Sequence, residues 1–226
     1  PFIWNAKDLL EQSINMNSGW NWNSIYVQPE SNVVEDIFAP IASIVEIAKD
    51  KEAYAMYGNR QWRGDLDEIN VGKMYKVKMR SATTLSVVGE KVDPAAEVVK
   101  VKSGWNWIGY TASFNMSIAD AFADLNPQDG DVVKSKNDFA IYNSYEWVGT
   151  LTALAPGSGY MYYSNATEEK EFTYPSQSSA QPTQMRIVQR RANEFVVDDN
   201  SNYSGNMTIV AVVKNGDVIE SAAEVG

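Results

Sequence analysis

Three carboxylates in the first half of the chain, Asp65, Asp67 and Glu68, come nearest in type and spacing to a catalytic set. Paired carboxylates hydrolyse glycosides when the two groups flank one bond, one acting as acid and the other as base or nucleophile. Residues this close in one segment point in different directions instead of flanking one bond. We therefore predict no catalytic residue, no cofactor and no enzymatic activity.

Two acidic segments offer oxygen atoms of the kind that Ca²⁺ prefers. Asp129 and Asp131 lie near Asn126, and residues 198–200 read Asp-Asp-Asn. Neither segment has the ligand spacing of an EF-hand. Asp, Asn and Gly are also the ordinary residues of polar turns and linkers. We favour a turn and a linker here, and we assign no metal ligand.

Composition excludes several other classes of function. The chain has no histidine and no cysteine, so it lacks the commonest proton carrier near neutral pH and the commonest transition-metal ligands. With 29 acidic against 19 basic residues, its net charge of −10 repels phosphate backbones. No apolar run approaches the length needed to cross a bilayer. We expect neither nucleic acid as a partner nor membrane insertion.

An internal repeat organises the elements that would position such residues. The tetrapeptide Gly-Trp-Asn-Trp stands at residues 19–22 and again at 104–107, an offset of 85 positions (105 − 20 for the first tryptophan). The same offset pairs further residues: Lys49 with Lys134, Lys51 with Lys136, Tyr57 with Tyr142, Trp62 with Trp147, Gly72 with Gly157, and Tyr75 with Tyr160. Asp65, Asp67 and Glu68 correspond to Thr150, Thr152 and Ala153, so these carboxylates belong to one copy alone. One supersecondary design is therefore used twice.

Hydrophobic periodicity predicts that each copy is mainly β with one short helix. Short aromatic and β-branched runs between turn residues predict strands, among them residues 54–57, 75–79, 139–142 and 160–163. Helical spacing follows Asn32 in one copy and Ser117 in the other, each with an acidic residue three positions on, as in a capping box. The predicted fold class is mainly β (α+β per module), with two tandem repeats of a small β-rich module and a partial β-sandwich-like segment.

The sequence divides into five segments. We expect residues 1–11 to be the tail of a preceding unit, 12–90 repeat module 1 (copy 1), 91–175 repeat module 2 (copy 2), 176–190 a polar linker, and 191–226 the start of a third β-rich domain. In the last segment an apolar run, Asn215-Gly216 and Val218-Ile219 predict a hairpin. The chain starts without methionine and stops inside a strand-like run, so we expect it to be a piece of a longer protein.

Residues 104–110, Gly-Trp-Asn-Trp-Ile-Gly-Tyr, are followed by Tyr-x-x-x-x-Trp-x-Gly at 142–149 and Leu-x-x-Leu-x-Pro-Gly-x-Gly-Tyr at 151–160. This pattern resembles the GWN-type tandem repeat modules of exported bacterial cell-surface proteins, and residues 206–213 resemble the opening of an Ig-like domain. Copy 1 departs from the pattern at residues 71–74. The resemblance implies an extracellular or cell-surface, non-catalytic segment with spacer, adhesion or accessory roles. Its partners would be neighbouring domains of the parent chain and a surface glycan or protein.

Aromatic residues shared by both copies are best explained by the scaffold, because two units with different contacts still need the same core. This reasoning predicts burial for the two indoles of each tetrapeptide and for the later shared aromatics. The predicted scaffold residues are Trp20, Trp22, Trp62, Tyr75, Trp105, Trp107, Trp147 and Tyr160.

Positions that differ between the copies are better candidates for binding. Lys76 and Lys78 on the closing strand of copy 1 become Met161 and Tyr163, so an outward charged edge turns apolar. Three interpretations remain open for this patch: packing against copy 1 or the linker, a protein partner, or a sugar platform of amphipathic aromatics. The candidate binding residues are Tyr145, Trp147, Met161 and Tyr163.

Overall fold

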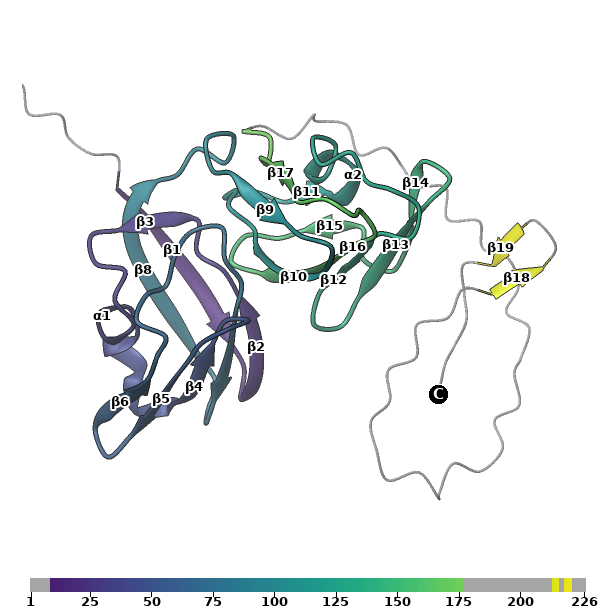
Figure 1. The fold of residues 1–226 in the computed structure, drawn as a ribbon. Helices are drawn as coiled ribbons and strands as arrows, with labels where there is room; N and C mark the ends of the chain where they lie inside the picture. Colours follow the sequence, from purple (N-terminus) through teal and green to yellow (C-terminus); the bar gives the residue numbers. More distant parts are fainter. Residues whose placement is uncertain (1–8, 177–212, 216–217, 221–226) are drawn as a thin grey trace, which may run out of the picture. The chain divides into compact units, whose positions relative to one another are not determined.

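The structure is a computed structural model that describes residues 9–176, 213–215 and 218–220. It is mainly β, with antiparallel strands and, among the described residues, two short α-helices (Figure 1). Residues 9–176 belong to one compact unit and the C-terminal hairpin to a second. The predicted mainly β fold class is therefore confirmed.

Each copy builds a five-stranded antiparallel sheet with the same strand order (Figure 1). In copy 1 the order is β2 (Gly19–Asn23), β7 (Tyr75–Met79), β4 (Val45–Lys49), β5 (Tyr54–Gly58) and β6 (Gln61–Gly64). In copy 2 it is β10 (Gly104–Gly109), β16 (Gly159–Ser164), β12 (Val132–Lys134), β13 (Phe139–Asn143) and β14 (Glu146–Gly149). The duplication seen in sequence is thus a duplication of sheet topology.

Shorter sheets complete each module. In copy 1, β8 (Thr83–Lys91) lies between β1 (Leu9–Met16) and β3 (Val27–Pro29). In copy 2, β9 (Val99–Val101) pairs with β17 (Lys170–Phe172), and β11 (Met116–Ser117) pairs with β15 (Ala153–Leu154). The second unit contributes the antiparallel pair β18 (Val213–Asn215) and β19 (Val218–Glu220), so two strands pair where the sequence predicts a hairpin.

The helix of each copy is short. α1 spans Val34–Phe38 and continues into a 3₁₀ helix at Ala39–Ile44, whereas α2 spans Ile118–Ala121. Ser117 caps α2 as predicted, since its side chain accepts the Asp120 amide at 3.1 Å. The predicted cap at Asn32 is wrong, because Val33 holds the N-cap position and Asn32 Nδ2 donates instead to Asn70 Oδ1 at 2.8 Å.

Each module has its own core between its sheet and its helix. In copy 1, buried Phe38 packs its ring 5.8 Å from Trp62, and Tyr57 meets Trp62 edge-on at 5.3 Å. In copy 2, Trp147 meets Tyr142 edge-on at 5.2 Å, so the Tyr–Trp pair is built twice with nearly the same geometry. Aromatic pairs of this kind stabilise a core beyond the area that they bury.

The repeated Gly-Trp-Asn-Trp motif presents its asparagine to the core and its indoles to the opposite face. Asn21 and Asn106 are each 7% exposed, whereas Trp20 and Trp105 are each 39% exposed. Trp22 and Trp107 are half-buried on the same outer face. The sequence predicts core burial for these four indoles, and this prediction is wrong, although strand alternation itself holds.

The reason is a side-chain staple formed by the asparagine. Asn21 Nδ2 donates to the Asn17 and Gly19 carbonyls at 2.7 and 3.0 Å, and its Oδ1 accepts the Asn17 amide at 2.9 Å. Asn106 repeats this pattern with Lys102 and Gly104. Both glycines have positive φ, 84° and 80°, which few other residues adopt. The motif therefore encodes a closed turn ahead of a strand, since it satisfies buried polar groups.

The two copies contact each other through equivalent residues. The Ser24 amide donates to the Gly157 carbonyl at 3.0 Å, and the Gly109 amide donates to the Gly72 carbonyl at 2.9 Å. Ser24 corresponds to Gly109 and Gly72 to Gly157 in the repeat, so one contact is made in both directions, as in an isologous dimer. The flanking β-bridges obey the same relation: Asn23 with Ser158, and Lys73 with Ile108.

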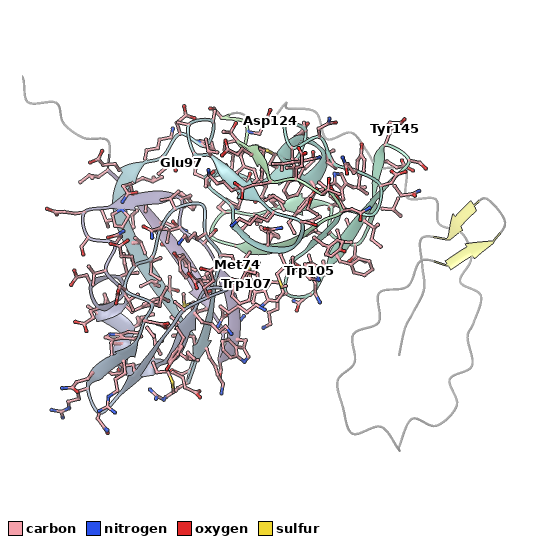
Figure 2. All side chains as sticks on the ribbon, in the orientation of Figure 1. Met74, Glu97, Trp105, Trp107, Asp124 and Tyr145 are labelled. Carbon is pink, nitrogen blue, oxygen red and sulfur yellow. The ribbon has the colours of Figure 1, made fainter. Side chains whose placement is uncertain are left out.

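Two glycines allow the copies to approach this closely. A Cβ at Gly109 would lie 2.5 Å from the Lys73 carbonyl oxygen, and one at Gly159 would lie 2.5 Å from Met74 Cγ. Met74 is fully buried and lies at this contact, where Figure 2 labels it beside Trp107. Copy 1 and copy 2 are therefore packed into one unit.

Some predictions fall outside the described residues. They concern the tail at residues 1–8, the linker from residue 177 onward, residues 198–200, and most of the apolar run that precedes Asn215-Gly216.

Candidate functional site

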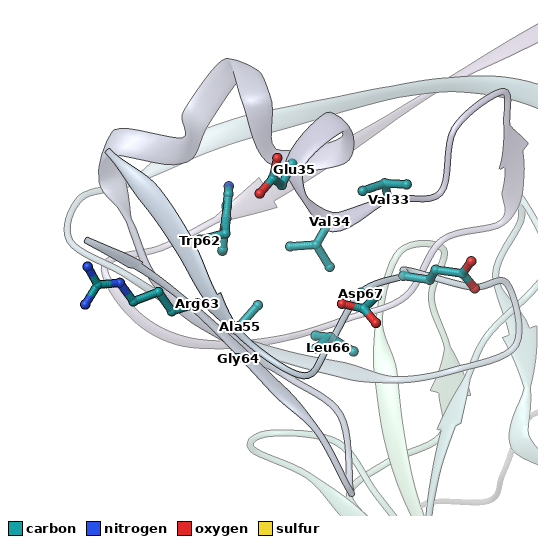
Figure 3. A pocket seen from close by; sticks show the side chains of 10 residues that line it. Val33, Val34, Glu35, Ala55, Trp62, Arg63, Gly64, Leu66 and Asp67 are labelled. Atoms are coloured by element: carbon teal, nitrogen blue, oxygen red, sulfur yellow. The ribbon is translucent and has the colours of Figure 1, made fainter. Parts of the chain in front are cut away.

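A cavity of about 220 Å³ lies in copy 1 between α1 and the segment that follows β6 (Figure 3). Glu35 on α1 and Asp67 and Glu68 on that segment line it, together with Trp62 and Arg63. Two of the three carboxylates that the sequence singles out therefore line the cavity, and so does Glu35, which the sequence indicates only as a capping-box residue.

Hydrogen bonds fix the segment of copy 1 that carries Asp65, Asp67 and Glu68. Asp65 Oδ1 accepts the Tyr54 amide at 3.0 Å, which joins the segment to β5. The Asp67 carbonyl accepts the Val34 amide at 2.8 Å, which joins the same segment to α1. Glu68 Oε2 accepts from the Asn70 side chain at 3.4 Å. Glu35 lies on the α1 side of the cavity and Asp67 on the opposite side (Figure 3).

The acidic turn of copy 2 is closed by its own protein partners. Asp131 is buried, and its carboxylate accepts from Tyr162 Oη at 2.7 Å, the Asn165 amide at 2.7 Å and the Gln128 amide at 3.0 Å. Asp129 Oδ1 accepts the Ser144 amide at 2.9 Å. These bonds account for the Asp-Gly-Asp sequence as a turn, and within the described residues no cluster suited to a metal ion occurs.

The four candidate binding residues of copy 2 do not form one platform. Trp147 is 6% exposed and packs in the core against Phe122, at 5.6 Å between ring centroids. Tyr145 is 94% exposed at the tip of the β13–β14 hairpin, which lies at one edge of the sheet. Tyr163 lies on β16, next to β10 at the opposite edge, and Figure 2 labels Tyr145 and Trp105 at separate places. The sugar platform made of Tyr145, Trp147 and Tyr163 is therefore not assembled.

Met161 and Tyr163 both lie on the outer face of the copy 2 sheet. Tyr163 meets the indole of Trp105 edge-on at 5.4 Å. Met161 Sδ lies 3.8 Å from Nζ of Lys76, its own equivalent in copy 1. Packing against copy 1, the first of the three interpretations of this patch, thus applies to Met161.

A lysine is held between the two equivalent tryptophans where the copies meet. Lys76 Nζ lies 4.3 Å from the ring centroid of Trp22 and 4.3 Å from that of Trp107. Lys49 Nζ lies 5.7 Å from the same Trp107 ring. Cation–π contacts of this kind stabilise by about 0.5–2 kcal/mol, more when water is excluded. The indoles expected in the core thus bridge the two copies instead.

Sequence reasoning missed this contact, although one signal for it was present. Lys49 and Lys134 are retained as a pair 85 positions apart, and so are Lys51 and Lys136. Lys51 Nζ donates to the Trp105 carbonyl at 2.8 Å across the contact. Retained charges inside a duplicated β unit indicate a shared polar environment, and the periodicity of single strands does not reveal it.

Buried tyrosines are the most strongly perturbed titratable groups of the described chain. Burial raises the pKa of Tyr75 to about 12, although the Asn70 amide donates to its oxygen at 2.8 Å and opposes the shift. Burial also raises the pKa of Tyr160, whose oxygen accepts the Ala155 amide in the equivalent bond. Burial, followed by the Asp131 carboxylate, raises the pKa of Tyr162 well above its usual range. These phenols stay protonated and serve the scaffold.

Comparison with known proteins adds no family to this description. No family model, no curated protein and no solved structure is matched by the chain. The resemblance to GWN-type modules and to an Ig-like opening stays a prediction. In the part of the chain that the structure describes, no helix has the length and apolar character of a membrane span.

Proposed function

We propose that the chain is a non-catalytic structural and interaction segment of a large secreted or surface-anchored bacterial protein. In this role the two fused modules space or present neighbouring domains of the parent chain. The observation that carries the proposal is the reciprocal contact between the copies, in which Ser24 and Gly109 each donate to the other copy. A spacer needs modules that move together, and this contact joins them at the backbone.

The site geometry supports the same role. The Asp65 carboxylate accepts a backbone amide and the Glu68 carboxylate accepts from a side chain nearby, and the aromatic candidates of copy 2 divide between core and surface. An extracellular or cell-surface location is part of the proposal and follows from the resemblance of residues 104–110, 142–149 and 151–160 to repeat modules of exported proteins. Protease accessibility of this segment on intact source cells tests the location.

Calorimetry tests whether the copies act as one unit. We expect the wild-type chain to unfold copies 1 and 2 in a single transition. The Gly109→Ala variant places a Cβ against the Lys73 carbonyl, and we expect it to cost about 2–4 kcal/mol and to split the transition in two. The matched control is Gly58→Ala, where no atom lies within 4 Å of the added Cβ.

Calorimetry can also contradict the proposal. If the wild-type copies already melt in two independent transitions, and Gly109→Ala shifts neither of them, the modules do not form one mechanical unit. The spacer role would then lose its support.

A further inference from the structure

Three lysines gather where the outer faces of the two sheets meet, and we call Lys49, Lys76 and Lys134 the lysine cluster. Lys49 and Lys76 are directly opposite each other on β4 and β7. Lys134 is directly opposite Met161 on β12 and β16, and Met161 Sδ lies 3.8 Å from Lys76 Nζ. The cluster therefore draws on both copies.

The cluster is arranged about the axis that relates the copies. Lys49 and Lys134 are equivalents in the repeat, as are the two indoles that enclose Lys76. Only the central position differs, with Lys76 in copy 1 and Met161 in copy 2. Because the design is duplicated, each copy places one of these equivalent lysines, Lys49 or Lys134, beside the contact between the copies.

This arrangement of like charges is unfavourable for the protein by itself. Like charges directly opposite each other on neighbouring strands destabilise a sheet. Burial, with Lys49 and Lys134 nearby, lowers the pKa of Lys76. In the described part of the chain no ion pair joins the cluster to a carboxylate, whereas other lysines have such partners: Lys78 with Glu46, Lys100 with Glu171, and Lys102 with Glu169. Three lysines that no described carboxylate pairs with, in a chain of net charge −10, indicate a place for an external anion.

Exposed ring faces lie beside the cluster on the same surface. Trp105 is two residues from Trp107 on the same strand face, about 7 Å along the strand, and it is 39% exposed. Tyr163 supports this indole edge-on at 5.4 Å. Trp20 has the same place and the same exposure in copy 1. Rings held this way present an apolar face on which the C–H face of a sugar can pack.

We propose that this surface binds an acidic oligosaccharide, with its carboxylate or sulfate groups on the lysine cluster and a neighbouring sugar ring on Trp105. The lysines would bind the acidic groups, and the indole would pack against a sugar ring, so one ligand would use both features. An acidic peptide would use the charge alone, and so would a free inorganic anion. The site is independent of the spacer role, since a rigid double module functions with or without it.

Titration calorimetry of the complete chain, together with tryptophan fluorescence, tests the proposal. The probes are a galacturonate hexamer for carboxylates, a heparin hexasaccharide for sulfates, a neutral maltohexaose, hexaglutamate and inorganic phosphate. We expect one or both acidic sugars to bind, to quench or shift the indole emission, and to weaken as salt rises. The two acidic sugars distinguish the carboxylate source from the sulfate source.

Variants separate the cluster from general charge. Lys49→Gln with Lys134→Gln should weaken acidic-sugar binding at least tenfold, and Trp105→Ala should weaken it by about as much. The matched control is Lys100→Gln with Lys102→Gln, which removes two exposed lysines of copy 2 that are paired with Glu171 and Glu169. Circular dichroism of each variant verifies that it is folded.

Three outcomes would overturn the site. The first is that neither acidic sugar binds at millimolar concentration. The second is that hexaglutamate or phosphate binds as tightly as the sugars, which would mean that the surface recognises charge alone. The third is that the control pair reduces binding as much as the cluster pair. If the sugars fail to bind, the result of the unfolding calorimetry on the fused modules is unaffected, so the two proposals are tested separately.

Discussion

The outer faces of the two five-stranded sheets carry equivalent rows of residues with different chemistry. Across copy 1 the row is Trp20, Lys78, Ile47, Met56 and Arg63. Across copy 2 it is Trp105, Tyr163, Val132, Ile141 and Val148. Two cations of the first row are thus replaced by a tyrosine and a valine in the second.

The inner faces differ far less. The staple of Asn21 is repeated by Asn106, and the oxygen of Tyr75 accepts a backbone amide just as that of Tyr160 does. The comparison teaches that the duplicated parts are those that close turns and fill cores. The outer faces were free to diverge, except at the contact where both copies must fit one another.

High pH should produce the largest change, because the copy 2 core contains more buried phenols than the copy 1 core. Burial raises the pKa of Tyr110, Tyr160, Tyr162 and Tyr174 in copy 2, and that of Tyr75 to about 12 in copy 1. Since unfolded tyrosines lose their protons near pH 10.0 while these keep them, stability is complete below that pH and falls above it.

Each such tyrosine contributes a loss of up to about 1.4 kcal/mol per pH unit above pH 10. The lowered pKa of Lys76 acts in the opposite direction, because its cost is relieved as the pH rises toward 10.5, but it is one group against several. Urea unfolding at pH 8 to 11.5 measures the slope, and Tyr75→Phe should reduce it by one group. A free energy of unfolding that stays constant through pH 11 would contradict the prediction.

Removing the staple should be costly by a similar amount in either copy. Asn21→Ala and Asn106→Ala each leave part-buried carbonyls without their side-chain donor, and we expect a loss of about 1–2 kcal/mol in the free energy of unfolding. Asn137→Ala, at an exposed turn position, is the control and should cost less than about 0.5 kcal/mol. Chemical denaturation measures all three. A large effect in one copy and none in the other would show that the motif is not one shared device.

The central position of the contact offers a smaller test. Met161→Lys gives copy 2 the residue of copy 1 and adds an ammonium beside Lys76 and Lys134. We expect a loss of about 1–2 kcal/mol at low ionic strength, which shrinks as salt is added. Met161→Gln keeps a similar size without the charge and serves as the control. A salt-independent loss would instead indicate a packing effect.

The hairpin tips should give the smallest effect. Ser144 and Tyr145 have φ of 50° and 71°, and the equivalent Asn59 and Arg60 have 53° and 62°. A bulky residue at positive φ is strained, so Tyr145→Gly should stabilise the fold by about 0.5–1 kcal/mol. Thermal denaturation measures the shift, with Arg60→Gly as the matching change in copy 1. A loss of stability would mean that the Tyr145 side chain has a contact worth more than the strain.

Several features could be predicted from the sequence because they depend on local chemistry. The aromatic run at 139–142 forms β13, and Ser117 caps α2, since strand propensity and capping operate over a few residues. Asn32 shows where such rules stop. Its side-chain amide instead donates to Asn70, which is distant in sequence. This tertiary hydrogen bond takes the place of the local bond that a helix cap would make.

By itself the sequence determined that one β-rich design occurs twice, because matched residues keep an offset of 85 positions, as between Trp62 and Trp147. Only the tertiary structure decided which face of each Gly-Trp-Asn-Trp strand enters the core. Alternation allows both choices, and the asparagine takes the inner face, where its side chain both donates to and accepts from part-buried backbone groups, which an indole cannot do. Two of the outward indoles, Trp22 and Trp107, enclose Lys76 where the copies meet. This contact depends on how the two sheets pack against each other.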